Sequence, residues 1–132
     1  MNPTARAMLA RYQKVQVTTC SNERLLVMLF DGLVRFVEEA AAALDEGDRP
    51  RLGERVGKAL AILEHLTGTL NRTEAPELCE RLEGTYLFAM SRLTEANVRK
   101  ERRALEDVLR ILVPLRDAWR VAVEQVEASR SG

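Results

Sequence analysis

The chain contains 132 residues, of which 46% are hydrophobic, and its 20 basic and 20 acidic side chains give a formal net charge of +0. This length fits one domain that buries a core without disulfides or metals, and the apolar content excludes a disordered chain. The balanced charge argues against a nucleic-acid-binding protein, which usually carries a basic excess. No apolar run approaches the roughly 18 residues of a membrane span, and the start lacks the pattern of a signal peptide. We therefore expect a cytoplasmic (cytosolic) protein that binds neither nucleic acid nor membrane.

The first twenty residues differ from the rest of the chain. Residues 1–20 carry apolar, β-branched and polar side chains without a helical stripe, which predicts a mobile N-terminal arm. The second unit spans 21–129, and Ser21 is a suitable N-cap for a first helix over about 22–46. Two adjacent apolar stripes run along this helix: Leu25, Leu29, Leu33, Phe36, Ala40 and Leu44, and beside them Leu26, Phe30, Val34, Val37 and Ala41. This apolar arc is wider than one core contact requires.

Three further helices follow in the sequence. Gly47 is predicted to end the first helix, and Asp48 to cap a second helix that runs to about Asn71. Thr73 is predicted to cap a third helix, which ends at the basic run 98–100. The inner faces of the second and third helices are predicted from apolar spacings of three and four residues: Leu52, Val56, Leu60, Leu63, Leu66 and Leu70, then Leu78, Leu82, Tyr86, Ala89, Leu93 and Asn97.

The fourth helix is predicted over about 102–128 and contains Pro114. This proline predicts a kink and not a break, because the apolar stripe continues in phase beyond it. The stripe consists of Leu105, Leu109, Leu112, Leu115, Trp119, Val123 and Val126. Four helices with short connections predict an all-α fold, an antiparallel four-helix bundle. Gly32 costs about 1 kcal/mol relative to alanine within the first helix, and it indicates either tolerance of a glycine or the close approach of another helix.

The sequence contains no pattern typical of a catalytic or metal site. His65 is the only histidine, and residue 62 is Ile, so the Glu-x-x-His pattern of di-metal bundles is absent. Histidine phosphotransfer modules are four-helix bundles of this length, but His65 lacks their following lysine; the alternative interpretation is a histidine at the edge of the core. Cys20 and Cys79 match no metal or redox spacing. We therefore expect no cofactor, no metal and no enzymatic activity.

Apolar surface is present in excess of what the predicted core uses. The arm carries Met8, Leu9, Tyr12, Val15 and Val17 without a helix of its own, and the first helix has its second stripe. We expect the arm to fold over a groove on the bundle, from which a helix of another protein could displace it; the alternative is a flexible tail that covers no groove.

Four segments resemble the flagellar secretion chaperone FliS family. They are YQKVQVTTCS at 12–21, LLVMLFDGLVRF at 25–36, LTEAN at 93–97 and LRDAW at 115–119. Each match is weak alone, but together they occur in the family's order and spacing over about residues 9–120.

The resemblance implies a chaperone that binds the C-terminal segment of flagellin, which forms helices on it. It further implies prevention of premature polymerisation in the cytosol and delivery of the cargo to the flagellar type III export gate. In the family, the N-terminal arm and its tyrosine take part in binding and can occupy the empty cargo groove. The residues expected to bind the partner are Leu9, Tyr12, Val17, Leu26 and Phe30. A homodimer without cargo is also expected; a phosphotransfer module and a self-associating structural bundle are the alternative functions.

Overall fold

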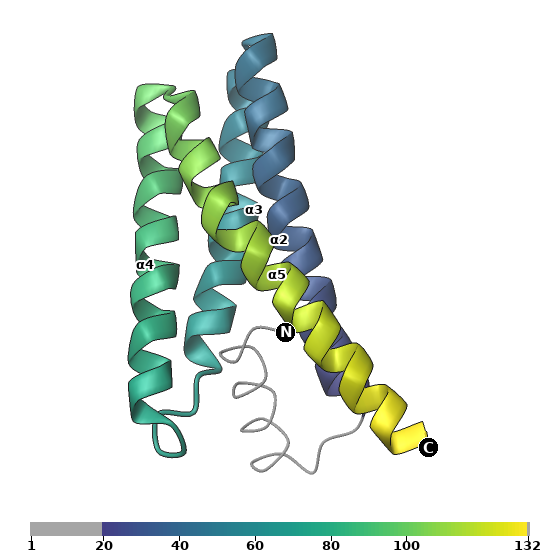
Figure 1. Cartoon of the computed structure of the whole chain (residues 1–132). Coiled ribbons are helices and arrows are strands. Elements are labelled where there is room, and N and C mark those ends of the chain that lie inside the picture. Colours follow the sequence, from purple (N-terminus) through teal and green to yellow (C-terminus); the bar gives the residue numbers. More distant parts are fainter. Residues whose placement is uncertain (1–19, 132) are drawn as a thin grey trace.

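The computed structural model describes residues 20–131, with side chains over 23–130. This part of the chain contains four α-helices and no strand: α2 (Cys20–Glu46), α3 (Arg49–Gly68), α4 (Pro76–Arg99) and α5 (Arg102–Ser131). Each helix packs against the next, and α5 also packs against α2, so the helices close into one bundle (Figure 1). The predicted all-α helical bundle is confirmed. The predicted arm lies outside the described residues, apart from Cys20.

The turn between α2 and α3 forms as predicted. Gly47 has a φ of +73°, and its N–H donates to the carbonyl of Leu44 at 3.1 Å, while the N–H of Asp48 donates to the carbonyl of Ala43 at 2.9 Å. This pair of bonds is the Schellman arrangement that ends a helix at a left-handed glycine. The Asp48 carboxylate then accepts a hydrogen bond from the N–H of Arg51 at 3.1 Å, which caps α3.

The prediction that Thr73 caps the third helix is wrong. Ala75 is the N-cap residue and makes no side-chain cap bond. Pro76 restricts the residue before it to extended backbone, so the helix cannot begin earlier. The loop is held instead by Asn71, whose side-chain oxygen accepts from the N–H of Glu74 at 3.1 Å.

Two other predicted boundaries also differ. The first helix begins at Cys20 and so includes Ser21. The second ends at Gly68, before Asn71, because the N–H of Thr69 turns back onto the carbonyls of His65 and Leu66. Boundary shifts of one to three residues are usual where a helix end frays or tightens.

The buried face of α2 is centred on the second of its two predicted stripes. Leu26, Phe30, Val34, Val37 and Ala41 are all buried; of the first stripe only Leu33 and Ala40 are, and Leu25 is 52% exposed. Sequence periodicity finds both stripes but does not say which one faces the other helices. The core is completed by the inner faces of α3, α4 and α5, where Leu52, Leu63, Tyr86, Leu93, Leu105, Leu112 and Trp119 are buried.

Gly32 is buried where α2 meets α3. A Cβ added there would lie 3.6 Å from Cδ1 of Ile62, an ordinary van der Waals distance. The helix that lies next to Gly32 is therefore the bundle's own α3. Because the contact leaves room for a methyl group, the position tolerates a glycine but does not require one.

The helix α5 spans 30 residues and continues through Pro114, as predicted. Figure 1 shows that it slants across the bundle, from beside α4 at its first turns to the start of α2 at its last. The rings of Phe30 and Trp119 meet between α2 and α5, with centroids 6.2 Å apart. Both side chains are fully buried, and such burial contributes about 1.5–3 kcal/mol for a side chain of the size of phenylalanine.

Two ion pairs join the start of α2 to the end of α5. Arg130 binds Glu23 through two nitrogens, at 2.8 and 2.6 Å, and the Glu23 residue is only 2% exposed. One residue along, the Nε of Arg24 lies 2.9 Å from an oxygen of Glu127, in a more exposed pair. The bidentate pair fixes the geometry of both helix ends.

Candidate partner-binding surface

The five predicted site residues fall into two groups. Leu9, Tyr12 and Val17 lie outside the described residues, so their role stays a prediction. Leu26 is 9% exposed and Phe30 is fully buried in the core. The residues of α2 that a partner could touch directly are therefore neighbours of the predicted pair.

The first turns of α2 expose two large apolar side chains. Leu25 is 52% and Met28 is 66% exposed. They lie three residues apart, on one side of the helix, and they flank Leu26 in sequence. An unbranched methionine adapts its shape to a partner at little cost. These two exposed side chains form an apolar surface on the outer side of α2, which we call the α2 rim.

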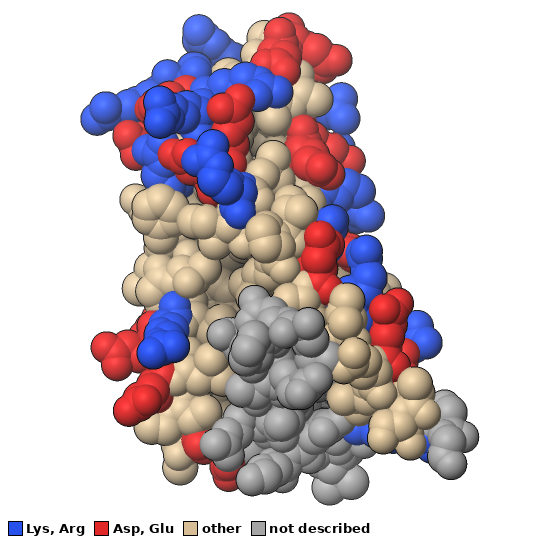
Figure 2. Space-filling view, viewed as in Figure 1, with Lys and Arg blue, Asp and Glu red and all other residues tan. Residues whose placement is uncertain are grey.

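A second apolar surface lies on the outer face of α4. Residues 84–91 contain no charged side chain, and within them Leu87 is 53% and Phe88 is 44% exposed. Figure 2 shows charged side chains gathered at the end of the bundle that carries the turn from α4 to α5, with an uncharged band below it. We call the exposed residues of α4 from 77 to 99 the α4 face.

Sequence reasoning missed Leu87 and Phe88. Leu87 and Phe88 lie beside the predicted inward stripe. That stripe contains Tyr86 and Ala89, which are buried as predicted. The signal that could have identified them is the uncharged run 84–91. It spans about two helical turns, so some of its residues must lie on the outer side of the helix, where charged side chains are usual.

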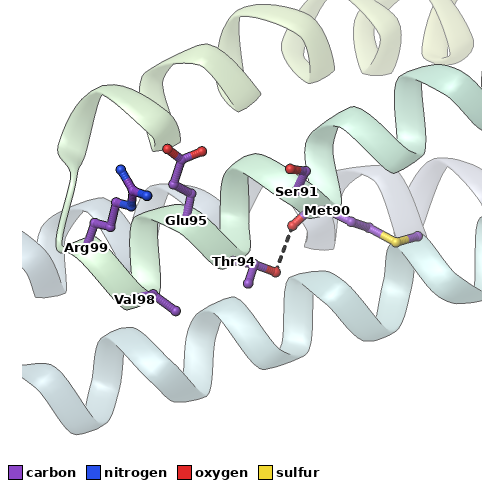
Figure 3. Close-up of a pocket in the computed structure, with 6 residues that line it drawn as sticks. All are labelled: Met90, Ser91, Thr94, Glu95, Val98 and Arg99. Carbon is purple, nitrogen blue, oxygen red and sulfur yellow. Dashed lines mark hydrogen bonds between the residues drawn. The ribbon is translucent and has the colours of Figure 1, made fainter.

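A shallow hollow continues the α4 face toward its C-terminal end. Its volume is about 500 Å³, and it is lined by Met90, Ser91, Thr94, Glu95, Val98 and Arg99. Figure 3 shows Met90, Thr94 and Val98 on one side of α4 and Ser91, Glu95 and Arg99 on the other. Val98 is 71% exposed, so the hollow has an apolar edge and a charged edge.

One of the charged side chains near this hollow forms an ion pair with α5. Arg92 donates to Glu95 at 2.8 Å and to Asp107 of α5 at 2.9 Å. The hydrogen bond to Asp107 raises the pKa of Arg92, and a hydrogen bond to Asp45 likewise raises the pKa of Arg102. These guanidinium groups hold helices together and remain protonated.

The family-like segments of α2 and α5 meet in the fold. Asp31 accepts a hydrogen bond from Arg120, and the Nε of Arg116 lies 3.8 Å from the same carboxylate oxygen. The Arg116 pair and the contact between Phe30 and Trp119 join the segment 25–36 to the segment 115–119, and Arg120 directly follows that segment. The most recognisable residues of the sequence therefore hold α2 against α5.

The described residues were compared with the requirements of metal-binding and catalytic sites. Within 20–131, no group of three or more His, Cys, Asp or Glu side chains could hold a metal ion. His65 is exposed in the last turn of α3 and not at the edge of the core, which corrects the expected position. Cys79 is a buried free thiol. None of the described helices is long and apolar enough to cross a membrane.

Comparison with known proteins gives independent evidence for the family of this chain. Residues 4–126 match the family model described as "Flagellar protein FliS". The flagellar secretion chaperone FliS of Bacillus subtilis is 32% identical to this chain, with 92% of this chain and 90% of the relative covered. The corresponding chaperone of Vibrio cholerae is 30% identical (86% and 87% covered), and that of Salmonella typhimurium 31% (79% and 78%). This chain, whose described helices leave apolar surfaces open on α2 and α4, belongs to the FliS family of flagellar secretion chaperones.

Proposed function

We propose that this chaperone binds the disordered C-terminal segment of flagellin in the cytoplasm, prevents its premature polymerisation and assists its delivery to the flagellar export gate. The observation that carries the proposal is the α2 rim. Leu25 and Met28 stay exposed although the bundle core beneath them is filled. Exposed apolar side chains gathered in this way mark a binding site for another protein.

The α2 rim fits an amphipathic helix better than a small molecule. Its two side chains are more than half exposed on the surface of α2, and an apolar helix face binds such a surface through anchors at spacings of three and four residues. Binding would bury the rim at about 25 cal/mol per Å² of apolar area. Ordering of a disordered cargo offsets about 2–5 kcal/mol of that gain.

The residues predicted from sequence take two roles in this proposal. Leu9, Tyr12 and Val17 in the arm contact the cargo beside the rim. Leu26 and Phe30 hold α2 in the bundle, because both are packed within the core cluster. Replacement of Phe30 therefore acts through the fold, whereas replacement of Met28 acts on binding alone.

No catalytic step is part of this role. The curated relatives are named secretion chaperones, and the chaperone acts by holding its cargo unpolymerised. Release at the export gate then needs only a competing contact that loosens the cargo.

Isothermal titration with a flagellin C-terminal fragment tests the rim. The double variant Leu25→Ser/Met28→Ser should weaken binding at least about 10-fold, since truncation of central apolar anchors removes most of the binding energy of an interface. Tyr12→Ala should weaken it in the same direction.

Val121→Ser is the matched control, because Val121 is also an exposed apolar side chain, 41% exposed, but lies on α5. Its affinity should stay close to that of the unchanged protein. Equal affinity of the double variant and the control would count against the rim; no binding of the fragment by the unchanged protein would count against the function.

A further inference from the structure

We propose that Met28 is an oxidation site, at which a hydroperoxide weakens the binding of cargo by this chaperone. The inference rests on the proposed function, because Met28 belongs to the α2 rim, and it adds a chemical control of that surface. The chain contains four methionines. The side chains of two of them, Met28 and Met90, lie within the described residues.

Met28 is the more accessible of these two methionines. It is 66% exposed, and the sulfur lies near the far end of an unbranched side chain, so exposure of this extent leaves it open to a small oxidant. Met90 is only partly exposed, because it packs against the core cluster and lines the hollow on α4 (Figure 3). A limiting amount of oxidant should therefore modify Met28 before Met90.

The chemical step needs no catalytic group of the chain. The sulfur of Met28 donates an electron pair to one oxygen of hydrogen peroxide, the simplest hydroperoxide, and an S–O bond forms as the O–O bond breaks. The second oxygen leaves with both protons as water, so the thioether is oxidised by two electrons to methionine sulfoxide. Methionine sulfoxide reductases reverse the change: their thiols are oxidised to a disulfide, and the oxygen leaves as water.

Oxidation at this position acts on binding and not on the fold. Met28 belongs neither to the core cluster of the described residues nor to the side chains packed against it. Its neighbour on the rim, Leu25, has no atom that reacts in this way. One of the two exposed side chains of the rim thus becomes polar, while the core of the bundle keeps its contacts.

The sulfoxide weakens cargo binding because its oxygen must lose water. In the free chaperone this oxygen accepts hydrogen bonds from water, and the apolar face of a cargo helix supplies no donor to replace them. Bound cargo in turn covers Met28 and excludes the oxidant. The modification therefore affects the chaperone that has not yet bound cargo.

Isothermal titration of the oxidised full chain tests the proposal. The chain is treated briefly with hydrogen peroxide, catalase removes the excess, and the affinity for the flagellin C-terminal fragment is compared with that of the untreated sample. Treatment should weaken binding by about 5-fold, and methionine sulfoxide reductases should restore it. The urea midpoint should stay unchanged, because Met28 lies outside the core.

Two variants separate Met28 from the other oxidisable groups. Each is compared with its own untreated sample, so the result does not depend on its initial affinity. Met28→Leu removes the thioether and should abolish the effect of peroxide, although Cys79 and Met90 remain. Met90→Leu is the matched control and should keep the full sensitivity.

Peptide mapping by mass spectrometry locates the oxidised residue. Trypsin cleaves after lysine and arginine, which places the four methionines on separate peptides, Met28 within 25–35 and Met90 within 82–92. The added oxygen should appear first in the peptide 25–35. Saturating flagellin fragment should slow its appearance there.

Equal loss of affinity in the unchanged protein and in Met28→Leu overturns the proposal, since another group is then responsible. Complete oxidation of Met28 at unchanged affinity overturns it as well, and so does oxidation of Met90 ahead of Met28. These results leave the proposed function standing if the untreated protein binds the fragment. If the untreated protein binds no fragment, the proposed function and this inference both fail.

Discussion

At the scale of single residues, two glycines of this chain serve opposite purposes. Gly57 lies exposed within α3, and nothing approaches within 4 Å of an added Cβ. Alanine there should raise the free energy of unfolding by about 0.5–1 kcal/mol, because it reduces the entropy of the unfolded chain and favours the helix. The measurement is a shift of the urea midpoint at an unchanged m-value.

Gly47 provides the opposite control. Its φ of +73° ends α2 in the left-handed region, so alanine at this position should lower the free energy of unfolding by about 1–2 kcal/mol. If both alanine variants shifted the free energy of unfolding in the same direction, the helical backbone assigned to Gly57 and the left-handed backbone assigned to Gly47 would be contradicted.

At the scale of elements, the junction between the start of α2 and the end of α5 depends on one buried carboxylate. The Glu23 side chain is 1% exposed and Arg130 binds it with two nitrogens. Glu23→Gln should lower the free energy of unfolding by about 1–3 kcal/mol, because it removes a desolvated charge from its partner. Urea unfolding of the variant measures this loss.

The neighbouring pair is the control for this prediction. Arg24 is 70% exposed where it meets Glu127, and Arg24→Gln should cost under about 0.5 kcal/mol, as exposed ion pairs do. A loss from Arg24→Gln as large as that from Glu23→Gln would show that burial is not what makes the junction strong.

The helices were predictable from sequence because each carries a regular apolar stripe and the connection between α2 and α3 carries clear end signals. Gly47 and Asp48 behave as their residue types require, and Pro114 sits within one continuous helix. The start of α4 at Pro76 was not predictable from capping propensity alone, because the restraint of Pro76 on Ala75 overrides the better capping residue, Thr73. Capping propensity and the steric restriction before a proline predict different helix starts here, and the steric restriction determines the observed one.

The candidate site was less predictable than the fold. The sequence shows that α2 has more apolar surface than one contact needs, but the choice between two adjacent stripes depends on where α3 and α5 lie. Leu26 and Phe30 are taken into the core, and Leu25 and Met28 are left outside. Periodicity defines a face relative to the helix axis, whereas exposure is defined only by the packed neighbours.

At the scale of the whole molecule, the chain combines a filled core with two separate apolar surfaces. The α2 rim lies at the start of the first described helix, and the α4 face lies on the third. Balanced charge leaves short-range contacts, and not long-range attraction, to select partners.

Flagellin polymerisation tests the central claim most directly, because it measures the consequence of binding. Seeded growth of flagellin filaments is followed by light scattering with increasing amounts of the chaperone. We predict that growth stops near equimolar chaperone, and that Leu25→Ser/Met28→Ser at the same concentration leaves most of the growth intact. Filaments that elongate at an unchanged rate in excess unchanged chaperone would contradict the account.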